Sequence, residues 1–264
     1  MIAHRRPLAA VIAGALIVAG AFATGMPARR ANAALLSVTV GSTRAVVPAG
    51  ASENVGRAPR ERDERRHLLV HVERAMAITA RPGAGRTIGT MPWGSRYYGI
   101  PTVAWVRHVS RNGRYGLVDV PYVAYRATGW IRLRGLERSH TRVSVAADLS
   151  AHRITVRRGD DVLLRAAAAT GASSSPTPTG RYFVTDRVPF PNGGMLGTFA
   201  FGISGIQPNL PPGWGGGDQL AIHGTNDASS IGRSASAGCL RVSEGTLTRL
   251  RRVLNLGTPV VIHP

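Results

Sequence analysis

Residues 221–241 read AIHGTNDASSIGRSASAGCLR, and this stretch decides how the chain is interpreted. In it, His223 stands 16 residues before Cys239, which is the single cysteine of the 264 residues. A free thiol is mostly protonated at neutral pH, and a nearby imidazole that accepts its proton makes it a competent nucleophile. The pair therefore predicts acyl transfer by a cysteine nucleophile. A buried, inert cysteine beside a loop histidine is the structural alternative.

The residues around this pair have predicted roles of their own. Gly238 permits a tight turn, and the backbone N–H groups of Gly238 and Cys239 are expected to converge on a developing oxyanion. Ser236 is expected to hold the turn, and either Ser236 or Gly224 is expected to orient His223 through a backbone carbonyl. Arg241 is a candidate ligand for a substrate carboxylate, and bracing of the loop by an acidic partner is the alternative.

Three features together resemble the catalytic signature of the L,D-transpeptidase (YkuD-type) family: His-Gly-Thr-Asn at 223–226, the spacing of 16, and Ser-Ala-Gly-Cys-Leu-Arg at 236–241. The resemblance extends over residues 143–264, with Asp-Leu-Ser at 148–150 and Thr-Gly followed by Pro-Thr-Pro-Thr-Gly between 170 and 180. It departs at Ala237, where many relatives carry a histidine or a charged residue. It implies a β-rich catalytic domain at 142–264 with one or two short helices.

This resemblance also implies a reaction, in which Cys239 attacks a tetrapeptide stem of peptidoglycan, releases D-alanine and forms a thioester. His223 would act as base and then as acid, and a stem amine would complete a 3-3 cross-link. Thr225 and Asn226 are expected to bind substrate. The glycine-rich segment 190–217 is expected to be a loop that forms a substrate lid, and a poorly ordered surface loop is the alternative. Attack by water would give L,D-carboxypeptidase trimming, and a non-enzymatic cell-wall binding protein is the alternative from another class. We expect no metal or cofactor.

Upstream of this domain, residues 67–138 contain short β-type runs between turn signals such as Arg-Pro-Gly at 81–83, which predict a small β-barrel. A loose resemblance to a bacterial SH3-like module rests on four motifs, TARP at 79–82, PWG at 92–94, YGLV at 115–118 and GWI at 129–131. The module is expected to be a spacer whose core holds Trp93, Trp105 and Trp130. A groove for wall peptides is the alternative.

The amino terminus predicts export. Arg5 and Arg6 precede an apolar run at 8–25, and Ala-Asn-Ala at 31–33 fits a cleavage site, so residues 1–33 are predicted to be a signal peptide. An uncleaved membrane anchor is the alternative, because the run is about the shortest that spans a bilayer. Residues 34–66, which end in a mixed charge run, are predicted to be a linker. The expected location is the periplasm, the cell wall or the extracellular space.

The charge balance points to anionic partners. The sequence has 33 basic residues, all of them arginine, against 14 acidic ones, for a formal net charge of +19. Such a surface attracts polyanions. Because the chain is expected to be exported, the predicted partners are anionic cell-wall polymers and peptidoglycan stem peptides. Nucleic acid is not expected, and membrane contact is expected only through an uncleaved amino terminus.

Overall fold

The computed structural model describes residues 66–124, 127–215 and 217–264. The predicted signal peptide and all but the last residue of the predicted linker lie outside these ranges. Within them the chain is mostly β, with one α-helix and one turn of 3-10 helix, which confirms the predicted mostly-β class. None of the described helices is both long and apolar enough to cross a lipid bilayer.

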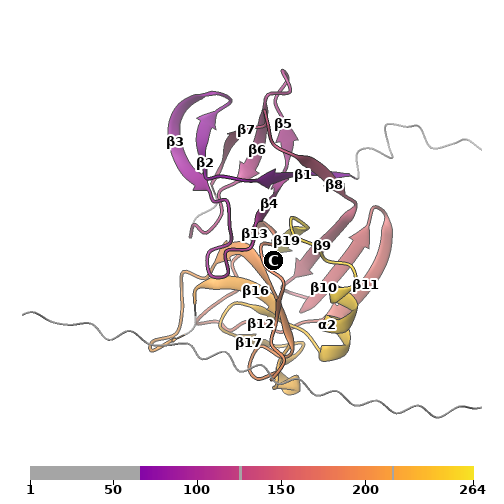
Figure 1. Ribbon diagram of the computed structural model, residues 1–264. Helices are drawn as coiled ribbons and strands as arrows, with labels where there is room; N and C mark the ends of the chain where they lie inside the picture. The colour runs from indigo at the N-terminus through magenta and orange to yellow at the C-terminus, as the bar shows by residue number, and fades with distance from the viewer. Residues whose placement is uncertain (1–65, 125–126, 216) are drawn as a thin grey trace, which may run out of the picture. The chain divides into compact units, whose positions relative to one another are not determined.

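The segment upstream of residue 142, which we call the upstream module, forms two sheets (Figure 1). The three-stranded sheet has the order β4-β1-β8, and the five-stranded sheet has the order β3-β2-β7-β6-β5. The strands are β1 (His67–Val72), β2 (Met76–Arg81), β3 (Ala84–Met91), β4 (Thr102–Val106), β5 (His108–Val109), β6 (Tyr115–Asp119), β7 (Thr128–Arg132) and β8 (Arg138–Thr141).

The upstream module buries a core of its own. Alternate residues of β6 and β7, such as Val118 and Ile131, are fully buried, as expected for strands with one apolar face. Trp105 packs against this core, but Trp93 is 53% exposed, so its predicted place in the core is wrong. Trp93 lies in the turn after β3, where its carbonyl accepts a hydrogen bond from Thr102. The SH3-like assignment stays a prediction.

The downstream domain (residues 142–264) is built on a five-stranded sheet with the order β11-β10-β9-β19-β13. Its strands are β9 (Val143–Asp148), β10 (Arg153–Arg158), β11 (Asp161–Ala167), β13 (Gly180–Phe183) and β19 (Pro259–His263). The terminal strand β19 pairs in parallel with β9, so the end of the chain closes the sheet between β9 and β13. The five strands agree with the β-rich domain that the resemblance implied for 142–264.

Helix α2 (Glu244–Arg251) begins directly after a capping serine, Ser243. The side chain of Ser243 accepts a hydrogen bond from the backbone N–H of Thr246, which satisfies one of the donors that a helix start leaves open. Leu247 and Leu250, on one face of the helix, are fully buried in the downstream core. This predicted helix is confirmed, and it covers the sheet through its apolar face.

A second sheet of the downstream domain carries the predicted site. Its order is β14-β15-β16-β18, from β14 (Val188–Pro189), β15 (Phe199–Ile206), β16 (Gln219–His223) and β18 (Leu240–Arg241). A short parallel pair joins β12 (Thr170–Gly171) to β17 (Ser234–Ser236), and the 3-10 helix η1 (Ala228–Ser230) lies between β16 and β17.

Strand β15 corrects the prediction of one continuous lid at 190–217. Seven of its eight residues are buried, and it pairs with β16. The glycines that suggested a loop are instead needed for close packing. A Cβ at Gly202 would collide with Asp186 and Gln219, and one at Gly205 would collide with the ring of Tyr182. Glycine inside a strand often marks such a close approach, and here the glycines led to the wrong prediction of a loop.

Candidate active site

Strand pairing brings His223 and Cys239 to one place. Parallel pairing of β16 with β18 sets Ile222 opposite Leu240 and His223 opposite Arg241. The backbone N–H of Val242 donates to the carbonyl of His223 at 2.9 Å, which fixes this register. Cys239 comes directly before β18, so it lies beside β16. The 15 residues between the pair form the connection that contains η1 and β17.

Both residues line one pocket of about 400 Å³. The turn at 236–239, which we call the nucleophile turn after the candidate nucleophile Cys239, contributes Ser236, Ala237 and Cys239 to the lining. The strands contribute His223 and Arg241. Its apolar wall comes from the segments on either side of β15, with Met195, Leu196, Leu210 and Trp214. The pocket is large enough for part of a peptide and is mostly apolar with a few polar groups, which is typical of a small-ligand site.

His223 is held in a neutral form with one nitrogen available. It is 3% exposed, and its Nδ1 lies 2.5 Å from the carbonyl oxygen of Gly224. Because a carbonyl only accepts, Nδ1 carries the proton and donates it, which leaves the lone pair on Nε2. The pKa of His223 is lowered to about 4, mainly by burial and also by the charge of Arg241, against the opposing effect of the hydrogen bond to the Gly224 carbonyl. A neutral imidazole of this tautomer can act as a base.

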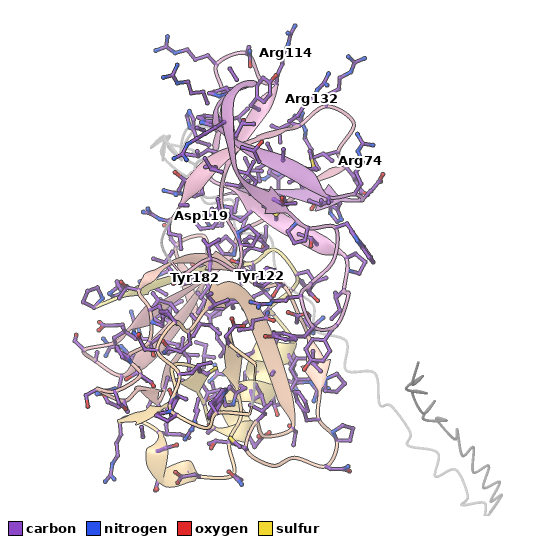
Figure 2. All side chains as sticks on the ribbon, turned by 90° about the vertical axis from the view of Figure 1, so that its left-hand side faces the viewer. Arg74, Arg114, Asp119, Tyr122, Arg132 and Tyr182 are labelled. Carbon is purple, nitrogen blue, oxygen red and sulfur yellow. The ribbon has the colours of Figure 1, made fainter. Side chains whose placement is uncertain are left out.

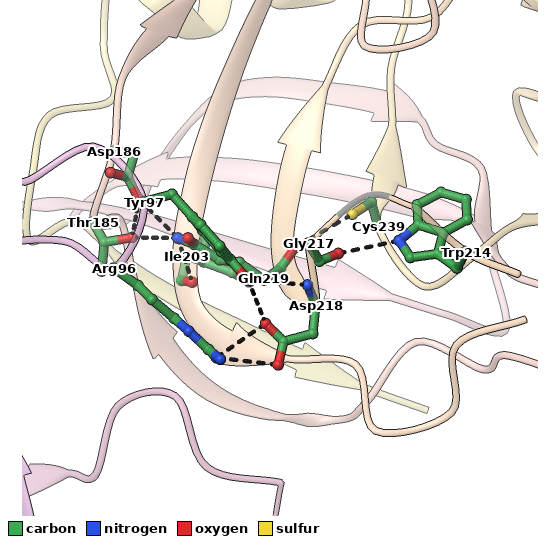
Figure 3. A network of polar contacts seen from close by, with 10 residues as sticks. All are labelled: Arg96, Tyr97, Thr185, Asp186, Ile203, Trp214, Gly217, Asp218, Gln219 and Cys239. Atoms are coloured by element: carbon green, nitrogen blue, oxygen red, sulfur yellow. Dashed lines mark hydrogen bonds and ion pairs between the residues drawn. The ribbon is translucent and has the colours of Figure 1, made fainter. Parts of the chain in front are cut away.

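Cys239 rests as a protonated thiol. The residue is half-buried, and its Sγ lies 3.9 Å from the carbonyl oxygen of Gln219, toward which the S–H points (Figure 3). Burial raises the pKa of the Cys239 thiol, while a backbone hydrogen bond with Ala221 and the charge of Arg241 act in the opposite direction. Among the described contacts, no hydrogen bond joins the thiol to the His223 imidazole. General-base activation of this thiol would therefore require its proton to move to the imidazole.

The turn before the nucleophile is held by Ser236. Its Oγ donates to the carbonyl oxygen of Cys239 at 2.6 Å and accepts from the backbone N–H of Gly238 at 3.0 Å. Gly238 has φ of +120°, a conformation open to glycine and strained for other residues. Ser236 makes no described hydrogen bond to His223, so it holds the turn while Gly224 contacts the imidazole.

The expected oxyanion role of Gly238 needs a correction. Its N–H already donates to Ser236 within a buried turn, so it is not available to a substrate in this conformation. The N–H of Cys239 itself takes part in none of the described hydrogen bonds. The backbone N–H of Cys239 is therefore the better candidate to donate a hydrogen bond to the oxyanion of a tetrahedral intermediate.

Arg241 reaches the pocket, whereas Thr225 and Asn226 do not line it. The Nε of Arg241 is buried without a described partner, so no acidic residue is shown bracing it there. Thr225 instead accepts a hydrogen bond from the N–H of Asp227 at 3.0 Å, at the start of η1. Asn226 is exposed. The expected substrate contacts of Thr225 and Asn226 are not supported, because the chain turns away from the pocket after Gly224.

Gln207 is a site residue that sequence reasoning missed. It is 3% exposed, and its Nε2 donates to three backbone carbonyls, those of Ser175 at 3.2 Å, Pro176 at 3.0 Å and Ala237 at 3.2 Å. It thus ties the Ser-Pro-Thr-Pro loop to the nucleophile turn. A polar residue at the end of the apolar run FGISGI was the only signal in the sequence.

The described residues contain no group of three or more His, Cys, Asp or Glu side chains placed to hold a metal ion. Of the two histidines four apart in β1, His71 contacts the hydroxyl of Ser139 at 3.0 Å through Nε2. His67 packs edge-on against Trp105. Both side chains thus have partners in the upstream module.

Comparison with known proteins gives one consistent family. Residues 142–262 match the family model described as YkuD, L,D-transpeptidase catalytic domain. The chain is 28% identical over 119 residues to YkuD of Bacillus subtilis and 28% identical over 120 residues to YkuD of Bacillus licheniformis. These matches cover 45% and 46% of this chain and 65% of each relative.

Solved structures resemble the chain more weakly. An L,D-transpeptidase from Mycobacterium smegmatis aligns at 15% identity and a TM-score of 0.39, over 74% of this chain and 99% of that one. Bd1075 of Bdellovibrio bacteriovorus aligns at 25% identity and a TM-score of 0.37, over 47% and 48%. The family assignment rests on the sequence matches and not on these scores. By those matches, residues 142–262 are similar to the YkuD family of L,D-transpeptidase catalytic domains.

Proposed function

We propose that the protein is a peptidoglycan L,D-transpeptidase that uses Cys239 as nucleophile and forms 3-3 cross-links. The observation that carries this proposal is the shared pocket. It combines the only thiol of the chain with a neutral imidazole whose Nδ1 is fixed by a carbonyl. The match of residues 142–262 to the YkuD family model supports the choice of substrate.

In the proposed first step, Nε2 of His223 takes the thiol proton as Sγ of Cys239 attacks the carbonyl that precedes D-alanine in a tetrapeptide stem. The C–N bond breaks, D-alanine leaves with the proton returned by His223, and a thioester remains. The amine of a second stem then attacks the thioester and gives its proton to His223. The thiolate leaves and is reprotonated, which restores the resting enzyme.

Arg241 is the proposed anchor for a stem carboxylate. It lines the pocket, and its Nε is buried without a described partner, which is costly unless a ligand supplies an acceptor. A carboxylate satisfies a guanidinium with two parallel hydrogen bonds. The segments before and after β15 would cover the bound stem through Leu196, Leu210 and Trp214.

Export and attraction to anionic wall polymers are part of the same proposal. The sequence basis for export is the segment at 1–33, and the basis for attraction is the net charge of +19. Arg114 and Arg132 project outward from the upstream module, away from the labelled Tyr182 of the downstream domain (Figure 2). Binding to isolated cell walls should weaken as salt is raised, because the ions screen these charges.

The proposal is tested with two assays on the purified protein. A carbapenem is expected to add its mass to the wild type and to leave Cys239→Ala unmodified, because the thiol is the acylated group. Incubation with a defined tetrapeptide is then scored for D-alanine release, cross-linked dimer and tripeptide. Dimer supports transpeptidation, and tripeptide alone indicates trimming by water. Equal labelling of wild type and Cys239→Ala, or no D-alanine release, would overturn the proposal.

A further inference from the structure

A turn of the upstream module carries two side chains to the edge of the candidate active site. The turn at 95–100, between β3 and β4, is pinned by Ser95, which is 5% exposed. The N–H of Ser95 donates to the carbonyl of Ile100 at 2.8 Å, and its Oγ accepts from the N–H of Ile100 at 3.1 Å. The next two residues, Arg96 and Tyr97, are therefore presented on a fixed turn.

Both side chains hold the carboxylate of Asp218 (Figure 3). Nη1 of Arg96 lies 3.0 Å from Oδ1 and 3.1 Å from Oδ2 of Asp218, and the hydroxyl of Tyr97 donates to Oδ1 at 2.8 Å. The same hydroxyl accepts from the N–H of Asp218 at 3.3 Å. The ring of Tyr97 also lies so close to Gly217 that a Cβ there would come within 2.8 Å of it. One carboxylate and its backbone are thus held by two residues about 120 positions away.

Asp218 lies within the wall of the pocket. Gly217 and Asp218 both line the pocket, and the carbonyl of Gly217 accepts a hydrogen bond from Nε1 of Trp214 at 3.2 Å. The carbonyl of Asp218 accepts from the N–H of Gln207 at 2.7 Å. Holding Asp218 therefore fixes the position of Trp214, which is the largest apolar side chain of the wall and is 38% exposed.

The next residue, Gln219, is anchored by different groups. Its Nε2 donates to Asp186 Oδ2 at 2.7 Å, to Thr185 Oγ1 at 2.9 Å and to the carbonyl of Ile203 at 3.2 Å. These partners belong to the downstream domain, and it is the carbonyl of Gln219 that the Cys239 thiol faces. The carbonyl that the thiol faces thus belongs to a residue whose side chain is bound within the downstream domain, whereas the side chain of Asp218 is bound by residues of the upstream module.

Two further contacts join the upstream module to the downstream domain. Phe183 of β13 is 2% exposed and belongs to the core of the upstream module. The N–H of Tyr122 donates to the carbonyl of Ser204 in β15 at 2.8 Å. The turn at 95–100 thus approaches Asp218 from a module that shares a core residue with the domain it contacts.

We propose that Arg96 and Tyr97 are positioning residues that hold the Trp214 wall of the substrate pocket through Asp218. The upstream module is then part of the substrate site and not a spacer. This inference rests on the proposed function for its kinetic consequence. Arg96 and Tyr97 do not touch the reacting atoms, so their loss weakens substrate binding and leaves the chemical step intact.

The kinetic test uses the double variant Arg96→Gln/Tyr97→Phe in the full chain. Its KM for the tetrapeptide donor is expected to rise about five- to tenfold, since charged hydrogen bonds that order the wall are lost, while kcat stays within about twofold. Alkylation of the single thiol by iodoacetamide is expected to keep its wild-type rate and pH profile. Tyr98→Phe is the matched control, because Tyr98 is 53% exposed and has no described hydrogen bond. Arg96→Lys, which keeps the charge, should recover part of the KM.

An unchanged KM in the double variant would overturn the inference, and so would a fall in kcat with slowed alkylation, which would mean that the thiol itself had been disturbed. Limited digestion with chymotrypsin gives a reading that needs no activity. Cleavage after Trp214, identified by mass, is expected to be faster in the double variant than in wild type and in Tyr98→Phe. If the wild type fails to release D-alanine, the proposed function fails. Digestion then still tests whether Arg96 and Tyr97 hold the Trp214 wall, because equal rates of cleavage after Trp214 in wild type and double variant would refute it.

Discussion

The buried neutral His223 makes the stability of the protein depend on pH in one direction. In the unfolded chain a histidine titrates near pH 6.5, but burial lowers the pKa of His223 in the folded chain to about 4. Between these values the unfolded chain binds a proton that the folded chain does not. The stabilisation is therefore fully present above pH 6.5 and is lost as the pH falls toward 4.

The magnitude follows from the difference between the two pKa values. A difference of about 2.5 corresponds to about 3 kcal/mol of unfolding free energy, and about 2.5 kcal/mol of that is already lost at pH 4.5. His223 is only 3% exposed, so little of this is removed by solvent screening. Against a typical total stability of about 5–15 kcal/mol, the loss is large enough to measure.

The assay is urea denaturation followed by tryptophan fluorescence at pH 7.5 and pH 4.5, for wild type and His223→Gln. Glutamine keeps an amide N–H for the carbonyl of Gly224 but does not titrate. Carboxylates titrate in both proteins, so the comparison isolates the histidine. Wild type should lose about 2 to 3 kcal/mol more than the variant between the two pH values. Parallel losses, equal within about 0.5 kcal/mol, would refute the buried neutral imidazole.

Three further predictions concern the nucleophile turn and the thiol. Gln207→Leu keeps the volume of the side chain but leaves buried carbonyls without a hydrogen-bond donor, so urea denaturation should show a loss of about 2–3 kcal/mol in the free energy of unfolding. A change under about 0.5 kcal/mol would contradict the role given to Gln207. Ser236→Ala frees the Gly238 N–H and the Cys239 carbonyl, and the rate of carbapenem acylation, measured by mass, should fall about tenfold; a wild-type rate would show that the turn holds without the hydroxyl. The rate of Cys239 alkylation by iodoacetamide should rise with pH through an inflection above the ordinary thiol pKa of about 8.5, because burial raises its pKa; an inflection near 7 would indicate a preformed thiolate.

The β-strands of the downstream domain could be predicted because their pattern is local. In β9 and β10, buried and partly exposed residues alternate, as Val145 and Val156 show by lying fully inside. The start of α2 was equally readable from Ser243, because a cap needs only residues within one helical turn. By contrast, β15 was wrongly predicted to be loop, because its glycines make room for side chains packed against the strand and do not form a turn.

The site was predictable in its residue types and not in its hydrogen bonds. His223, Cys239 and Arg241 meet in one pocket, as their shared motif implied. The direction of the Gly238 N–H was not predictable, because it depends on a serine rotamer. Thr225 and Asn226 belong to the motif but do not line the pocket, since motif membership alone does not place a side chain in the pocket.

What the sequence by itself determined is which groups can do the chemistry: a single thiol, an imidazole 16 residues before it, and a glycine where the turn requires positive φ. Tertiary structure alone decided what surrounds them, including the hold of Gln207 on the nucleophile turn and of Arg96 and Tyr97 on Asp218. The physical reason is range. Nucleophilicity and backbone freedom belong to a residue and its neighbours, whereas contacts across about 30 to 120 positions exist only after the sheets have packed.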